Sequence, residues 1–144
     1  MATEQQASSV DNVESTGVQS GGAPQGSDSW SRVTIVNHAA ANLIIEGHHV
    51  EDGTLSQAPP PAIAPGNSGV MRVEGSFWGR SQGWVAYTIA GKQTHVKIDF
   101  ECPTSANNNV SAVPLQNVTI SPFSLSGHLD VTVTINDSPS AAST

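Results

Sequence analysis

Two of the chain's three tryptophans lie within one short stretch, Phe77–Trp84, which reads Phe-Trp-Gly-Arg-Ser-Gln-Gly-Trp. An indole ring has an apolar body and a polar N–H, so an exposed tryptophan can insert among lipid headgroups or stack on a sugar ring. Arg80 adds a guanidinium that can hydrogen-bond a phosphate. Phe77, Trp78, Arg80 and Trp84 therefore form a candidate site for a lipid or another ligand. The alternative is that Phe77 or Trp84 simply fills the core.

No other part of the sequence offers a catalytic or metal-binding pattern. His48 and His49 are adjacent, and neighbours on a strand point to opposite faces, so they are poorly placed to share a metal ion. Cys102, the only cysteine, lies near acidic residues, which raise the pKa of a thiol and suppress the reactive thiolate. Glu51 and Asp52 precede a glycine, a pattern that is more typical of a turn than of a pair of acid–base catalytic carboxylates. We expect no catalytic residue, no metal and no cofactor, and hence a binding protein rather than an enzyme.

The chain is acidic, with a formal net charge of −7 and only five basic residues among 144. Nucleic-acid binding depends on clustered basic groups that displace counterions from phosphates, so we expect no nucleic-acid partner. The same shortage of positive charge disfavours purely electrostatic docking on anionic lipids.

The two ends of the chain differ in composition from its middle. Residues 1–29 are rich in Gln, Ser, Gly and acidic residues and have almost no large apolar side chain, so we expect an acidic disordered tail. Residues 138–144 predict a second disordered tail, which leaves a single domain over residues 30–137. The start has neither the basic nor the apolar region of a signal peptide. We therefore expect a protein that is cytoplasmic or exported without a leader.

Short stretches of alternating apolar and polar residues predict the fold of that domain. Over His95–Glu101, Val96, Ile98 and Phe100 alternate with polar side chains, which is the pattern of a half-buried strand. Glycine, proline and asparagine mark turns between such stretches. The pattern indicates an all-β fold, a small antiparallel β-sandwich. Six further strands are expected at Arg32–Asn37, Asn42–Glu46, Val70–Glu74, Gly83–Ile89, Leu115–Ser121 and Leu129–Asn136.

Five segments also occur in the order and spacing of one known family. They are Val33–Asn37 for its opening strand, Ile63–Gly66 for its IxPG turn, Val73–Gly83 for AESNGFMTGTEG, Val85–Ile89 for VTYTI, and Phe100–Pro103 for (W/F)-D-(C/N)-P. From Val33 to about Asn109 the sequence thus resembles the aegerolysin family, including the small aegerolysin-like component of bacterial binary insecticidal toxins. Two departures are Gln82, where an acidic residue is usual, and Thr104, which replaces an aromatic residue.

This resemblance implies a β-sandwich of the aegerolysin/actinoporin-like type that acts at target membranes by binding membrane lipid, often sphingolipid. It also implies a toxin whose cytolysis or hemolysis needs a larger pore-forming partner, and it leaves assembly into a homo-oligomer open. Trp78 and Arg80 stand at the family's aromatic or glycine-rich loop. Two other functions remain open: a carbohydrate-binding lectin that uses the same tryptophans, and a protein-interaction module that pairs through an exposed sheet edge.

Overall fold

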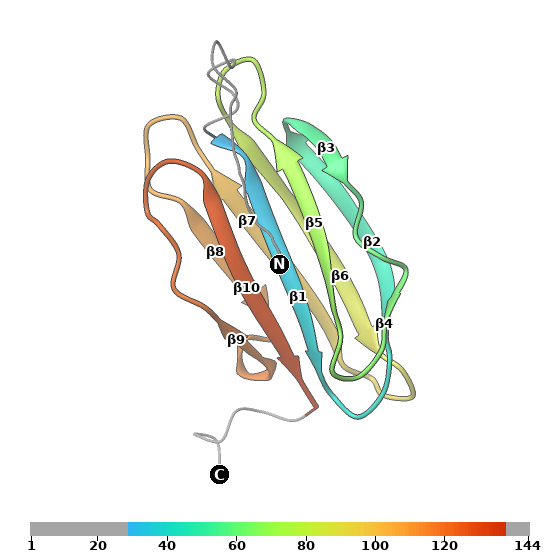
Figure 1. Ribbon diagram of the computed structural model, residues 1–144. Helices are drawn as coiled ribbons and strands as arrows, with labels where there is room; N and C mark the ends of the chain where they lie inside the picture. The colour runs from blue at the N-terminus through green and yellow to red at the C-terminus, as the bar shows by residue number, and fades with distance from the viewer. Residues whose placement is uncertain (1–28, 138–144) are drawn as a thin grey trace.

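The computed structural model describes residues 29–137, which form ten strands in two five-stranded sheets (Figure 1). The expected tails lie outside these residues, apart from Ser29. The first sheet has the order β3 (Thr54–Gln57), β5 (Ser68–Glu74), β1 (Ser31–His38), β10 (Leu129–Asn136) and β9 (Val118–Ile120). The second has the order β4 (Ala62–Ile63), β2 (Leu43–Asp52), β6 (Ser81–Ile89), β7 (His95–Cys102) and β8 (Asn109–Val113).

The two sheets stack face to face, which confirms the predicted all-β sandwich (Figure 1). One pairing departs from the antiparallel prediction. β1 and β10 run parallel, with Ser31 opposite Leu129 and His38 opposite Asn136, whereas every other strand pair in the described residues is antiparallel. Alternation along a strand predicts which face is buried but not the direction of a partner almost one hundred residues away.

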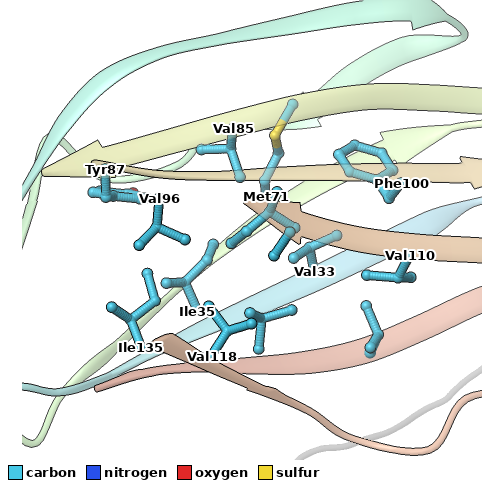
Figure 2. Packing of buried hydrophobic residues seen from close by; sticks show 14 of the residues in the cluster. Val33, Ile35, Met71, Val85, Tyr87, Val96, Phe100, Val110, Val118 and Ile135 are labelled. Atoms are coloured by element: carbon cyan, nitrogen blue, oxygen red, sulfur yellow. The ribbon is translucent and has the colours of Figure 1, made fainter. Parts of the chain in front are cut away.

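The core lies between the sheets and follows the alternation in the sequence. Val96, Ile98 and Phe100 of β7 are at most 2% exposed, as the pattern of that strand predicts. The inward residues of the facing sheet interdigitate with them (Figure 2). Burial of this apolar surface is the main force that holds the sandwich together, since the one cysteine cannot form a disulfide within the chain. The fully buried positions of the other long strands include Val33, Ile35, Met71, Val73, Val85, Tyr87, Ile89, Leu129, Val133 and Ile135.

Three short strands, β3, β4 and β8, were not expected from the sequence. β8 falls in a Ser- and Asn-rich segment in which only Val110 and Ala112 face inward, too few for a clear alternation. The expected strand Leu115–Ser121 is also shorter than predicted. A turn of 3₁₀-helix, η2 (Leu115–Asn117), takes up its first half, and only Val118–Ile120 pairs with β10.

Glycine is required at one point where the central strands of the second sheet meet. A Cβ on Gly83 of β6 would lie 2.4 Å from the backbone oxygen of His49 on β2 and 3.1 Å from the ring of Phe100. The glycine that the sequence places before Trp84 therefore lets β2 and β6 approach each other closely.

Candidate functional site

The residues between β5 and β6 form a tight turn with Phe77 and Trp78 at its centre. The Gly79 N–H donates to the Ser76 carbonyl at 2.8 Å, and the Ser76 N–H donates to the Arg80 carbonyl at 2.6 Å. The Ser76 hydroxyl accepts further bonds, each 3.3 Å, from the N–H groups of Trp78 and Arg80. Gly79 has a φ of +79°, a left-handed conformation that costs glycine little. Serine and glycine thus fix the turn without using either aromatic side chain.

Phe77 and Trp78 project from this turn into solvent. Phe77 is 77% exposed and Trp78 is 72% exposed. Their rings meet edge to face, with centroids 5.0 Å apart and planes at 85°, an arrangement that aromatic pairs favour. The alternative in which Phe77 fills the core is therefore wrong. We call Phe77 and Trp78 the aromatic tip.

Two neighbouring loops at the same end of the sandwich support the aromatic tip (Figure 1). From the β7–β8 loop, the Thr104 hydroxyl donates to the Trp78 carbonyl at 2.8 Å. The same loop is tied to the β9–β10 loop, since the N–H of Asn108 donates to the Leu125 carbonyl at 3.0 Å and its side-chain amide donates to the Ser124 carbonyl at 2.8 Å. Leu125 is 56% exposed, so this second loop adds an apolar side chain to the same end.

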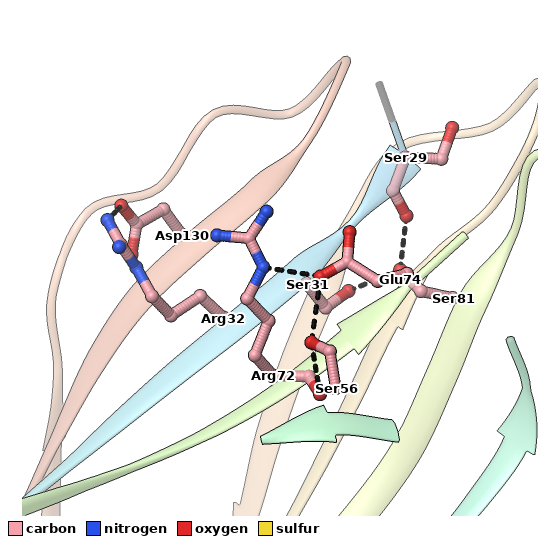
Figure 3. A network of polar contacts seen from close by, with 8 residues as sticks. All are labelled: Ser29, Ser31, Arg32, Ser56, Arg72, Glu74, Ser81 and Asp130. Atoms are coloured by element: carbon pink, nitrogen blue, oxygen red, sulfur yellow. Dashed lines mark hydrogen bonds and ion pairs between the residues drawn. The ribbon is translucent and has the colours of Figure 1, made fainter. Parts of the chain in front are cut away.

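A buried chain of hydrogen bonds anchors the aromatic tip to both sheets. Ser81, the first residue of β6, has its hydroxyl 2.6 Å from that of Ser31 on β1. The Ser81 hydroxyl also donates to the carbonyl of Ser29, at 2.5 Å. Both Ser31 and Ser81 are fully buried, and Figure 3 shows them side by side behind the polar surface of the first sheet. The turn therefore leaves the sandwich from a fixed base.

Arg80 lies at the base of the turn, between two carboxylates. Its Nε is 3.4 Å from Asp52 Oδ2, and its Nη2 is 4.0 Å from Glu101 Oε2. Both pairs are partly exposed, so each contributes little to stability. A phosphate at Arg80 would have to replace or share these carboxylate partners.

Trp84 lies on β6, within the strand expected at Gly83–Ile89, and not in the loop that carries Phe77 and Trp78. β6 begins at Ser81, and Trp84 lies on the outer face of that strand, opposite His49 of β2 and Asp99 of β7. It is half-buried, and it lies outside the core cluster. The alternative in which Trp84 fills the core is therefore wrong as well. The site residues thus separate into an aromatic tip with Arg80 at its base, and Trp84 on the sheet.

The remaining tryptophan, Trp30, is packed rather than presented to solvent. The Arg72 guanidinium lies 4.1 Å from its ring centroid, and the ring of His128 stacks on it at the same distance. Arg72 is held in turn by Glu74, whose carboxylate accepts its Nε–H at 2.6 Å and also accepts a bond from Ser56 (Figure 3). Trp30 therefore covers the outer face of the first sheet.

Two further expectations concern metal ligands and the thiol of Cys102. Across residues 29–137, no three histidine, cysteine or carboxylate side chains gather as metal ligands would. Cys102 is fully buried, and its thiol donates to the Gly127 carbonyl at 3.0 Å. Burial raises the pKa of the Cys102 thiol, so the direction matches the prediction, although the main cause is desolvation rather than the neighbouring acids. In the same range, no helix has the length and apolar character needed to cross a bilayer.

Sequence reasoning missed the residues that fix the aromatic tip in place. Ser76, Ser81, Thr104 and Asn108 act through hydrogen bonds to distant loops and strands, and nothing in their local sequence predicts those partners. The one usable signal was Ser76 with Gly79 three residues later, because serine is favoured at the first and glycine at the fourth position of a tight turn.

Comparison with known proteins bears on the fold. No protein-family model matches the chain, and no curated protein matches its sequence. Among solved structures, the crystal structure of the lipid binding protein Nakanori is similar, with a TM-score of 0.56 and 9% sequence identity over 74% of this chain and 71% of that one. At this identity the likeness establishes a shared fold.

Proposed function

We propose that the protein binds membrane lipids by inserting its aromatic tip into the headgroup region of a bilayer. The observation that carries this proposal is the exposure of two adjacent aromatic rings, 77% and 72%, on a turn held by hydrogen bonds of Ser76, Gly79 and Arg80. Large aromatic side chains that a protein holds rigidly in solvent mark a binding surface. Phenylalanine and tryptophan suit the membrane interface, because an apolar ring enters the acyl boundary while the indole N–H stays near polar groups.

The likeness to a lipid binding protein and the resemblance to the aegerolysin family support the same proposal from independent directions. The structural likeness depends on the path of the backbone, whereas the resemblance depends on short ordered motifs. The motifs of the resemblance include the region around the aromatic tip. We propose on these grounds that the chain is aegerolysin-like and that sphingolipid is its preferred lipid class.

The aromatic tip gives moderate rather than irreversible membrane affinity. Each ring removes roughly 150 Å² of apolar surface from water when it inserts fully, which corresponds to about 4 kcal/mol before the costs of association. Those costs consume much of this gain, so a second contact is needed for stable binding. Leu125 on the neighbouring loop and Arg80 at the base of the tip are the residues that we propose for it.

We further propose that any membrane damage requires a larger pore-forming partner, which the lipid-bound protein recruits. The aromatic tip consists of only two side chains. Their insertion perturbs one leaflet without opening a path across the bilayer. The protein alone should therefore bind vesicles without releasing a trapped dye. Release by the purified protein alone would contradict this part of the proposal and leave lipid binding intact.

Vesicle flotation tests the proposed site. We expect the wild type to float with vesicles of phosphatidylcholine and sphingomyelin, and more weakly with phosphatidylcholine alone or with phosphatidylserine. Trp78→Ala and Phe77→Ala should each reduce the bound fraction at least several-fold. Leu115→Ala is the matched control, because Leu115 is 61% exposed and lies far from the tip. It follows Val113 at one end of β8, whereas the other end of β8 pairs with Glu101 near the tip. Equal loss in Leu115→Ala, or no binding to any vesicle, would contradict the proposal.

A further inference from the structure

A groove of about 270 Å³ crosses the outer face of the second sheet, and neither Phe77 nor Trp78 lines it. It combines one aromatic ring with a set of polar side chains from four neighbouring elements. Its lining consists of Glu51, Gln82, Gly83, Trp84, Lys97, Asp99, Phe100, Glu101, Asn109 and Ser111.

The register of the sheet brings these side chains together in two rows. Trp84 of β6 is opposite Asp99 of β7, which is opposite Ser111 of β8. In the next row, Gln82 is opposite Glu101, which is opposite Asn109. Because side chains two residues apart share a face, both rows project from the same outer surface. An aromatic ring, carboxylates, amides and a hydroxyl therefore stand within reach of a single small ligand.

Trp84 lies across the sheet rather than standing upright in the groove. A Cβ on Gly47 of β2 would be 3.4 Å from Cη2 of the indole, so the absence of a side chain there makes room for the ring. The Lys97 ammonium is 4.8 Å from the ring centroid, in a cation–π contact. Lys97 is exposed and long, so it can move aside for a ligand at little cost or donate a hydrogen bond to it.

Several polar groups of the groove have no partner among the residues that the structure describes. Across residues 29–137, the side chains of Gln82, Asp99, Asn109 and Ser111 make no hydrogen bond or ion pair with the rest of the chain. On the first sheet the situation differs, since Arg32 is paired with Asp130 and Arg72 with Glu74 (Figure 3). Unpaired donors and acceptors beside a partly exposed aromatic ring are the features of a site for a polar ligand.

The charge of the groove limits the class of ligand. Glu51, Asp99 and Glu101 contribute three negative charges, which exceed the positive charges of Lys97 and of Arg80, 4.0 Å from Glu101. A phosphate, a sulfate or a sialic acid would be repelled by this surface. A neutral sugar fits it, because the C–H face of a pyranose ring packs on an indole while its hydroxyls donate to carboxylates and amides.

We infer that this groove binds a neutral sugar, with Trp84 as the stacking platform and Asp99 as the main acceptor for its hydroxyls. This site is distinct from the aromatic tip and does not depend on lipid binding. Trp84 lies three residues after Ser81, where β6 begins, roughly 10 Å along the strand at 3.3 Å per residue. With the tip inserted, the groove faces the layer just above the headgroups. The sugar can therefore come from a glycolipid in the same membrane or from a free glycan.

Two assays of the full chain test this inference and separate the two sources. The first is an array of neutral, sialylated and sulfated oligosaccharides, followed by titration calorimetry with the neutral ones that bind. The second is flotation with phosphatidylcholine vesicles that contain or lack a neutral glycosphingolipid. We expect neutral oligosaccharides to bind, Trp84→Ala and Asp99→Ala each to weaken that binding at least tenfold, and Trp78→Ala to change it less than twofold. Enhancement of flotation by the glycolipid, lost in Asp99→Ala, would identify the membrane as the source.

Two controls keep the result interpretable. Thermal unfolding shows whether Trp84→Ala is folded, and Asp99→Ala provides a second variant in which no aromatic packing is lost. The inference is overturned if the wild type binds no neutral sugar in either assay, if it binds only sialylated or sulfated glycans, or if both folded variants bind as well as the wild type. The aromatic tip is judged separately, by vesicles without glycolipid.

Discussion

The hydroxyl groups of Ser31 and Ser81 lie 2.6 Å apart in the interior, where their hydrogen bond joins β1 of the first sheet to β6 of the second. Ser81 also donates to the Ser29 carbonyl, so its single hydroxyl serves two partners. The bond lies one residue after the turn that carries Phe77 and Trp78. It therefore connects the stability of the sandwich to the position of its aromatic tip.

Replacement of Ser81 by alanine should destabilise the protein without changing the shape of the core. The change leaves the Ser31 hydroxyl and the Ser29 carbonyl without a partner, which costs about 1–3 kcal/mol for buried polar groups. Urea unfolding monitored by circular dichroism measures this loss. A change of less than about 0.5 kcal/mol in the free energy of unfolding would mean that the serine pair is replaceable by water.

Tyr87 should make the protein less stable in alkaline solution. Its side chain is fully buried and its hydroxyl donates to the Pro60 carbonyl at 2.7 Å. Burial raises the pKa of Tyr87 to about 12, from an ordinary value of 10. Because the folded pKa is the higher one, the stabilisation is complete below about pH 10 and is lost as the pH rises toward 12, to a total of about 2–3 kcal/mol.

Tyr87 is the only tyrosine in the chain, so its titration can be observed directly. The near-ultraviolet absorbance of tyrosinate should appear with a midpoint near the raised pKa, or together with unfolding if the protein denatures first. A midpoint near 10 in the folded protein would show that Tyr87 is accessible to water.

Truncation of a core side chain should destabilise the protein far more than truncation of the aromatic tip. Ile98 is fully buried in β7, so Ile98→Ala should cost about 2–5 kcal/mol through lost burial and the cavity that remains. Trp78 is mostly exposed, so Trp78→Ala should change stability by no more than about 0.5 kcal/mol. Chemical unfolding of both variants checks this contrast. A large loss in Trp78→Ala would make that residue structural and weaken its assignment to ligand binding.

The sequence predicts the long strands well and the loops only in part. Val96, Ile98 and Phe100 alternate strictly, so their inward face follows from local pattern alone. β8 and β4 are edge strands with one or two inward residues, and partners far along the chain define them rather than their own composition. The parallel pairing of β1 with β10 has the same cause, since no local pattern encodes its direction.

The candidate site shows the same division. The aromatic residues Phe77 and Trp78 were found from composition, because two large apolar side chains beside a glycine stand out in a polar segment. The expected strand Gly83–Ile89 already contained Trp84, but its separation from the aromatic tip was not foreseen, since β6 begins two residues earlier, at Ser81. The groove around Trp84 was also beyond the sequence, because it arises from the register of β6, β7 and β8.

The depth of Trp78 in a bilayer tests the central proposal most directly. Tryptophan emission of the wild type should shift to shorter wavelength when sphingomyelin vesicles are added, and lipids brominated near the headgroup end of their acyl chains should quench it. In Trp78→Phe, which keeps an aromatic ring at the tip, vesicle binding should persist while most of the shift and the quenching disappear. If Trp78→Phe shows the same shift and quenching as the wild type on equal binding, Trp78 does not enter the membrane, and insertion of the aromatic tip is contradicted.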